Sequence, residues 1–436
     1  MTTSSRRGLT GADVPSGGGR LISLLGRPGA AFYLGAIGLY LFVRAGSFVY
    51  TPVRVTDTPT YEQVSAASLL SVDFLAGARP FTVPTLWKLL GDDHLRIVAH
   101  LTLSIIAWLT LAVAVATVIR QRVIRRLAFF LVLLFSATTE VILWDPLLLS
   151  ESVSLSLAAL LVAAWIWFVR VPDWSSVSAV LAATFLWAFV RDSHAYVILF
   201  VAAVVLVSFT FRAATSYKAA LAAGSVVIAL LSMASASEGF RWYQPMRDIL
   251  LNRVAADRSM EDHFEARLGP SWRDADARRV YARYLLAHPA YTFGDPFFGS
   301  QTTPFSSTDS ASALLDPDLR IYNDNAADRA VPLPAFVDDV AFVHGKGRVI
   351  ALVLFIAIGA AAVAFRFGAS TVWIVPVVML ISTIPHGLVA YHLSGLEVDR
   401  HALEAAVLLR VGALILALFA LDAFVIGIRT AGRRRS

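Results

Sequence analysis

Charged, histidine and tyrosine side chains gather in four short segments of this sequence, and each segment lies beside a long hydrophobic stretch. A carboxylate can take a proton from a hydroxyl group, and arginine or histidine can hold a phosphate through charge-assisted hydrogen bonds. Together these side chains are the components of a site that activates a hydroxyl beside a phosphate. The residues are Asp57, Tyr61, Glu62, Asp73, Arg79 and Lys88; Glu140, Asp145 and Glu151; Arg191, Asp192 and His194; and His386, His392, Glu397, Asp399, Arg400, His401 and Glu404.

The acidic residues also have structural interpretations that the sequence leaves open. Asp57 precedes Thr58 and Pro59, where a helix is expected to begin, and its carboxylate could cap that helix. Asp145 precedes a proline and could belong to a turn. Glu151 could be the acidic residue of a first helical turn, where the helix dipole favours negative charge.

The basic residues have similar alternatives. Arg191 and Asp192 could form a local ion pair, and Arg400 with His401 could be an ordinary anchor at the membrane interface. Arg410 lies about two turns inside the last hydrophobic stretch, and its side chain can reach back to the same face. Because charges in lipid are costly and usually functional, a shared pocket explains these residues better than independent structural roles.

Ten hydrophobic stretches must position these residues. The chain is 57% hydrophobic and its mean hydropathy is +0.67. A bilayer core needs roughly 20 apolar residues per helix. The sequence therefore predicts an all-α polytopic membrane protein with about ten transmembrane helices, at about 29–48, 95–118, 127–144, 151–169, 174–190, 196–211, 218–236, 348–365, 370–386 and 403–428.

Arginine is concentrated in every second connection between these stretches. By the positive-inside rule, both termini are predicted in the cytoplasm and the site segments on the external face. The first stretch has no small-residue cleavage site just after it and is predicted to be retained. The basic residues are Arg6, Arg7, Arg20 and Arg27; Arg120, Arg122, Arg125 and Arg126; Arg170; Arg212 and Lys218; Arg366; and Arg429 with Arg433–Arg435.

Composition narrows the class of function. The net charge of +6 comes from arginines spread over short loops, which argues against a nucleic-acid partner. The chain has no cysteine, which excludes disulfides and thiolate chemistry. Lysine is scarce beside arginine, as in proteins of GC-rich bacterial genomes. The predicted location is the bacterial plasma membrane.

The hydrophobic stretches divide the chain into predicted regions. Within the external loop, residues 59–76 carry apolar positions at helical spacing and predict one amphipathic interfacial helix, followed by a second short helix. The regions are a disordered cytoplasmic N-terminus (1–28), a transmembrane region (29–236) with an external loop (49–94), an external soluble segment (237–347) packed on the membrane part, C-terminal transmembrane helices (348–428) and a basic cytoplasmic tail (429–436).

The chain resembles the GT-C superfamily of polytopic glycosyltransferases, which use polyprenyl-phosphate sugars. The resemblance rests on TDTPTYEQ followed by GARPFTVPTLWKLLG, and on WDPLLLSESVSLSL, RDSHAY and LEVDRHALEAAVLLR. It covers most of the membrane part. In layout the chain is similar to the arabinofuranosyl- and mannosyltransferases of cell-envelope assembly.

The resemblance implies residue roles. An aspartate of the first external loop serves as general base in the family and matches Asp57, which would deprotonate the acceptor hydroxyl for attack on the anomeric carbon with inversion. Arg400 and His401 match the basic site that holds the donor phosphate, and Arg191 is a weaker match. Arg410 is a further candidate for the phosphate. The acceptor-binding or supporting candidates are Tyr61, Glu62, Arg79, Lys88, Asp145, Glu151, Asp192 and His194.

The implied partners are a polyprenyl-phosphate sugar, membrane lipids, and a glycan, lipid or protein acceptor. Many members of this superfamily carry two acids close together in the first loop, whereas here Asp57 lies between Thr56 and Thr58 and Glu62 is the next acid. This departure leaves open whether a divalent cation takes part.

Two other classes of function compete with the enzyme. A lipid or glycolipid flippase should carry ionisable residues near the bilayer midplane, often in two related halves. The predicted span interiors are apolar apart from Arg410, which favours the enzyme. The sequence does not distinguish the enzyme from an assembly subunit with a degenerate site.

Overall fold

The computed structural model is built of helices and describes residues 29–48, 51–211, 215–274, 276–299, 304–305, 333–395 and 397–433. Within these ranges it has no β-strand, only an isolated bridge between Val53 and Leu147. The all-α class predicted from the sequence is therefore confirmed. The N-terminus predicted to be disordered (1–28) and residues 434–436 of the basic tail lie outside the described residues.

Each of the ten predicted stretches contains a long helix. Among the described residues, seven helices are long and apolar enough to cross a membrane, namely α2, α6, α9, α12, α19, α20 and α21. They identify a multi-pass membrane protein, while the count of ten spans stays a prediction because α10 and α11 are shorter and α7 has 15 residues. The helices are α2 (Ala30–Ser47), α6 (Asp93–Val118), α7 (Arg122–Ser136), α9 (Glu151–Arg170), α10 (Trp174–Ala188), α11 (His194–Phe211), α12 (Ser216–Glu238), α19 (Lys346–Phe367), α20 (Ile374–His392) and α21 (Val398–Arg433).

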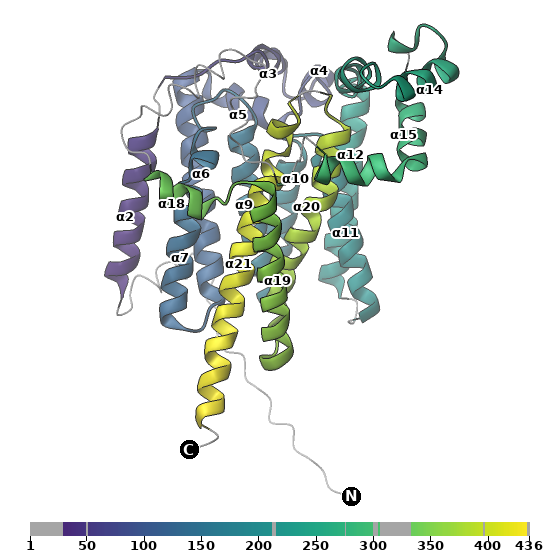
Figure 1. The fold of residues 1–436 in the computed structure, drawn as a ribbon. Coiled ribbons are helices and arrows are strands. Elements are labelled where there is room, and N and C mark those ends of the chain that lie inside the picture. Colours follow the sequence, from purple (N-terminus) through teal and green to yellow (C-terminus); the bar gives the residue numbers. More distant parts are fainter. Residues whose placement is uncertain are drawn as a thin grey trace, which may run out of the picture.

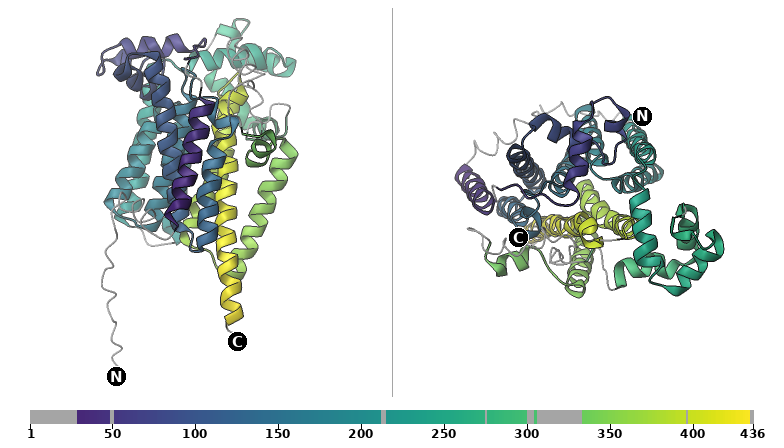
Figure 2. Two further views of the ribbon diagram at one scale, coloured as in Figure 1. Left: turned by 90° about the vertical axis from the view of Figure 1, so that its left-hand side faces the viewer. Right: turned by 90° about the horizontal axis from the view of Figure 1, so that it is seen from above.

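The long helices run side by side between two ends of the molecule (Figures 1 and 2). Helix α6 packs against α9, α11 against α12, and α20 against α21. Three short helices, α3 (Thr58–Ala66), α4 (Val72–Leu75) and α5 (Thr82–Leu90), lie across the end drawn at the top of Figure 1. We call this the site end, and the other the opposite end.

Polar caps fix where several helices begin. The Asp92 carboxylate accepts hydrogen bonds from two backbone N–H groups in the first turn of α6, at 2.9 and 3.1 Å. Asp173 and Ser176 form a reciprocal capping box at the start of α10. Such side chains satisfy N–H groups that have no partner within the helix. Polar side chains therefore determine where α6 and α10 begin.

The predicted amphipathic helix over residues 59–76 is wrong as a single helix. Helix α3 ends at Ala66, and α4 begins only at Val72. A new helix starts here because Ser71 caps it: the Ser71 hydroxyl accepts a hydrogen bond from Phe74 N at 3.2 Å. The predicted second short helix is present as α5.

Several predicted span boundaries also differ from the structure. Helix α7 ends at Ser136 rather than near residue 144, and Arg44 donates a 2.7 Å hydrogen bond to the carbonyl that this ending leaves free. Helix α20 continues to its last residue, His392, so His386 lies inside a helix and not in a turn. Helix α21 begins at Val398, which places Arg400 in its first turn rather than before it.

The segment predicted to be external, 237–347, forms short helices at the site end, including α14 (Arg258–Leu268) and α15 (Arg278–Ala287) (Figure 1). They enclose a small core of their own that includes Phe264 and Trp272. Tyr281 Oη lies 3.1 Å from His392 Nδ1, which joins this core to the end of α20. Residues 300–303 and 306–332 lie outside the described residues.

Asp422, for which the sequence suggested no role, fastens the opposite end. Its carboxylate accepts hydrogen bonds from the backbone N–H groups of Arg120 at 3.1 Å and Gln121 at 2.8 Å. These residues form the connection between α6 and α7. Asp422 therefore ties α21 to that connection.

Candidate functional site

Asp57 is the centre of a network of ion pairs at the site end. One carboxylate oxygen accepts a hydrogen bond from Arg79 Nη2, and the other accepts one from Arg400 Nη2 at 2.9 Å. Asp57 occupies the N-cap position of α3, but its side chain makes no capping hydrogen bond. The capping interpretation is therefore wrong, and the carboxylate is occupied instead by two guanidinium groups.

The two arginines determine the ionisation of Asp57. Burial by itself raises the pKa of the carboxyl, but the positive charges of Arg79 and Arg400 and their hydrogen bonds outweigh burial and lower the pKa to about 2. The Asp57 side chain is 27% exposed and is the more accessible partner of Arg400, which is 8% exposed. In the free protein Asp57 is therefore an accessible anion at neutral pH.

Arg400 extends the network to two further acids. Its Nε lies 3.0 Å from Glu397 Oε2 and 3.6 Å from Glu151 Oε1. Glu151 also pairs with Arg191, whose Nε donates a 3.2 Å hydrogen bond to Ser150 Oγ. We call this set the arginine–carboxylate network; it comprises Asp57, Arg79, Glu151, Arg191, Glu397 and Arg400. Its three positive and three negative charges balance.

Backbone contacts between two distant loops bring the members of this network together. The carbonyl of Val53 accepts a hydrogen bond from Leu148 N at 3.0 Å. The buried Thr58 hydroxyl donates to the Leu148 carbonyl at 3.1 Å. These bonds fasten the loop that carries Asp57 to the loop that leads into Glu151 and α9.

Tyr61 forms the buried wall behind the network. Its side chain is 4% exposed, the Arg79 guanidinium lies 4.9 Å from its ring centre, and the Trp87 ring packs against it at 5.4 Å. Burial raises the pKa of the Tyr61 hydroxyl, so the side chain stays neutral. His401 lies close enough to interact electrostatically with Arg400 and Asp57. Both predicted residues therefore adjoin the network.

Three predicted supporting residues lie elsewhere at the site end. Glu62 pairs with Arg54 in an exposed ion pair. Lys88 donates hydrogen bonds to two backbone carbonyls around the C-terminal end of α3, at 3.1 and 2.9 Å. Asp192 pairs with Arg241 at 2.9 Å. These contacts fasten loops, and none of them reaches Asp57.

Two further predicted residues are bound to partners outside the network. Asp145 pairs with Arg44 and accepts a 2.6 Å hydrogen bond from Ser152, and burial raises the pKa of its carboxyl. Arg410 donates a 2.9 Å hydrogen bond to the Val343 carbonyl. Sequence reasoning missed Arg44, although an arginine within the first predicted span was the available signal. The expectation that Arg410 is alone among ionisable residues inside the spans is therefore wrong.

The remaining predicted residue, His194, contacts Glu404 rather than the network. Its Nε2 lies 2.8 Å from Glu404 Oε2. Glu404 follows Arg400 by four residues, and this spacing puts it on the same face of α21, one turn further from the helix start. The spacing of four residues in the sequence could have predicted that Arg400 and Glu404 share one face of a helix.

The surroundings of Asp57 do not fit a divalent cation. Both of its carboxylate oxygens face guanidinium groups. Arg400 also separates Asp57 from Glu151, since it pairs with both. A cation placed there would meet like charge, so a metal bound directly by Asp57 is disfavoured.

A scan against protein-family models finds no match for this chain, and no curated protein matches its sequence.

Proposed function

We propose that this chain is an inverting glycosyltransferase of the bacterial plasma membrane. It moves a sugar from a polyprenyl-phosphate donor to a glycan, lipid or protein acceptor on the external face. One observation supports this most: Arg79, Arg191 and Arg400 lie in one network with a partly exposed carboxylate, Asp57, at one end of the membrane helices. Guanidinium groups are suited to phosphate oxygens, and a carboxylate can serve as a general base.

In the proposed reaction, the acceptor hydroxyl gives its proton to Asp57 as its oxygen attacks the anomeric carbon. The bond from this carbon to the phosphate oxygen breaks on the opposite face, and the electron pair leaves with polyprenyl phosphate. Arg400 and Arg191 hold the phosphate while negative charge develops on it. The sugar is transferred with inversion at the anomeric carbon.

Donor binding and base strength are coupled in this site. A carboxyl with a pKa of about 2 is a weak base. When the donor phosphate takes part of the charge of Arg400, Asp57 loses part of the stabilisation of its anion, and burial then raises its pKa. Asp57 thus becomes a stronger base only when the donor is bound.

The decisive variant is Asp57→Asn, assayed in membranes with radiolabelled polyprenyl-phosphate sugars. General-base assistance is worth about 10²- to 10⁴-fold, so we expect transfer to fall by about this factor. Donor binding should hold or tighten, because Arg79 and Arg400 lose an ionised competitor for the phosphate. Glu62→Gln is the matched control, since Glu62 lies in α3, just after Asp57, and pairs with Arg54 and Arg96 instead.

Near-native transfer by a well-folded Asp57→Asn chain would contradict the assignment of the base. The same membranes also test the flippase alternative. If a labelled lipid donor crosses the bilayer at equal rates with the native and Asp57→Asn chains, and neither chain transfers sugar, transport becomes the better description.

A further inference from the structure

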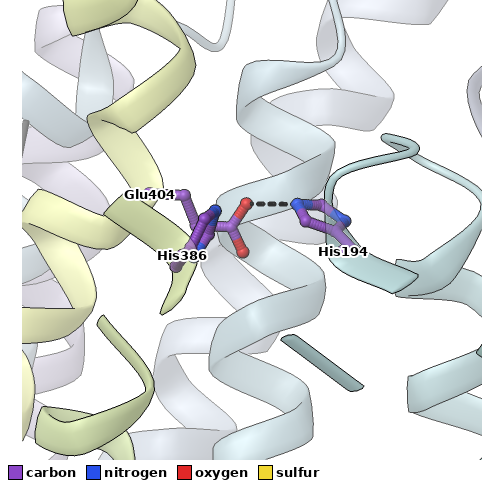
Figure 3. A group of neighbouring side chains, drawn as sticks. All are labelled: His194, His386 and Glu404. Atoms are coloured by element: carbon purple, nitrogen blue, oxygen red, sulfur yellow. Dashed lines mark hydrogen bonds and ion pairs between the residues drawn. The ribbon is translucent and has the colours of Figure 1, made fainter. Parts of the chain in front are cut away.

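A second polar cluster lies inside the helices and consists of His194, His386 and Glu404 (Figure 3). The side chains come from α11, α20 and α21; α11 lies far from the other two helices in sequence, and α20 packs against both α11 and α21. Their exposed fractions are 0%, 1% and 2%. One potential ligand atom from each residue lies within 4.8 Å of the others. The cluster is therefore compact and fully enclosed by protein.

Neighbouring groups orient His194 and Glu404. His194 Nδ1 lies 2.7 Å from the Trp187 carbonyl, and the Trp187 ring stacks on the imidazole with centres 4.0 Å apart. A hydrogen bond from Nδ1–H to a backbone carbonyl is how metal-binding histidines are commonly held, with Nε2 left for the ion. Trp187 Nε1 and Ser154 Oγ both donate to Glu404. Ligating carboxylates are also commonly held by such hydrogen bonds.

His386 supplies an independent observation. Its Nδ1 is buried and has no hydrogen-bond partner among the described residues. Leaving a buried polar atom without a partner destabilises the folded state. Its ring lies 5.8 Å from that of His194 and nearly perpendicular to it, on the Glu404 side of the cluster (Figure 3). A bound ion would supply the partner that this imidazole lacks.

We infer that His194, His386 and Glu404 form a binding site for a zinc ion. Two imidazoles and one carboxylate suit a divalent transition metal, whereas Mg²⁺ and Ca²⁺ prefer oxygen ligands. Ligand atoms around tetrahedral zinc lie about 3.3 Å apart, so the His194–Glu404 contact would open slightly and His386 would move closer. A hydroxide at the fourth position would, with Glu404, balance the charge of the ion.

This site is distinct from the arginine–carboxylate network. Glu404 lies one turn beyond Arg400 in α21, and His194 follows Arg191 by three residues. None of the three cluster residues pairs with Asp57. The zinc inference therefore stands or fails independently of the proposed transfer reaction.

The test measures the metal content of the purified full-length chain. The chain has a purification tag that contains no histidines, and it is expressed with added zinc. Mass spectrometry of the metal should find about one zinc per native chain. His386→Ala and Glu404→Gln should reduce zinc to background. His392→Ala is the matched control and should retain zinc, because His392 is a buried histidine of the same helix that contacts Tyr281 instead.

A native chain with no more zinc than His386→Ala, or with iron in its place, would overturn the inference. The native chain also gives a test that needs no variant. X-ray absorption at the zinc edge should show imidazole scattering from two histidines. A spectrum without imidazole scattering would overturn the site even if the variants fail to fold.

Discussion

Asp57 is held between Arg79 and Arg400, and this arrangement defines the resting site. Arg400 also contacts Glu151 and Glu397, so no single partner carries its full charge. An arginine shared among several carboxylates can turn toward a phosphate without leaving a buried acid wholly unpaired. In the proposed reaction, an incoming phosphate can therefore replace Asp57 at Arg400 while Asp57 keeps its pair with Arg79.

The proposed exchange predicts a specific pH dependence. In the free protein the pKa of Asp57 is about 2, below its ordinary value of 3.8. The ionised Asp57 carboxylate therefore stabilises the folded protein above pH 3.8, and this stabilisation is lost as the pH falls toward 2. We expect kcat/KM, which reports the free enzyme, to show no acid limb from Asp57 between about pH 4 and 8. The acid limb of kcat should lie at least about one pH unit higher than that of kcat/KM, because the donor phosphate weakens the arginine contacts.

Full pH profiles of both constants measure this difference. Coincident acid limbs would mean that donor binding leaves the pairing of Asp57 unchanged. The proposal that donor binding makes Asp57 a stronger base would then be wrong, although Asp57 could still accept the proton.

The sequence predicted which residues belong to the site better than it predicted which residues they pair with. Asp57, Arg191 and Arg400 were named from the sequence, and the structure joins them in one network. Lys88 and Asp192 were named on the same grounds, yet they fasten loops. The reason is that pairing depends on distances between segments that are far apart in the chain, and neither charge nor position along the sequence fixes those distances.

At the scale of elements, one link positions Asp57, the proposed base. The loop before α3 is bonded to the loop before α9 through the Val53 backbone and the Thr58 hydroxyl. Thr58 is fully buried, and its oxygen also accepts a 2.9 Å hydrogen bond from Val55 N. The Thr58 hydroxyl therefore provides the hydrogen-bond partner of both the Val55 N–H and the Leu148 carbonyl, next to Asp57.

Thr58→Val should break this link while keeping the shape of the side chain. It leaves the Val55 N–H and the Leu148 carbonyl without their partner, at a cost of about 1–3 kcal/mol. We expect a lower melting temperature and a loss of transfer, since Asp57 is no longer fixed. Thr58→Ser keeps the hydroxyl and is the control. Equal stability and transfer for the two variants would show that the link does not position Asp57.

Helix existence was predictable from hydrophobicity, but helix ends were not. Among the described residues, the apolar pattern located ten long helices, because burial of apolar surface in lipid or protein stabilises such helices. The ends depend on local polar contacts, such as the Ser71 cap that begins α4 and the Arg44 contact that closes α7. The Arg400 side chain also pairs with Glu397, the residue just before α21, so that helix begins among charged residues ahead of its apolar part.

At the scale of the whole molecule, the two ends differ in composition. The site end carries the network and the short helices α3, α14 and α15. The opposite end carries the arginine-rich connection between α6 and α7, and Arg170 at the end of α9. This division matches the charge asymmetry expected of a protein whose opposite end faces the cytoplasm. The proposed chemistry requires that orientation, since the lipid donor is used on the external face.

Single cysteines can test the orientation without background labelling, because the chain has no native cysteine. Glu265→Cys introduces an exposed thiol in α14 at the site end, and Ser216→Cys introduces one at the start of α12 at the opposite end. We expect an impermeant maleimide added to intact cells to label Glu265→Cys fully and Ser216→Cys only after the membrane is opened. Both positions are exposed in the structure, so accessibility to the reagent differs only through the membrane. The reverse pattern would place the arginine–carboxylate network in the cytoplasm, and a donor presented at the external face could then not reach Asp57.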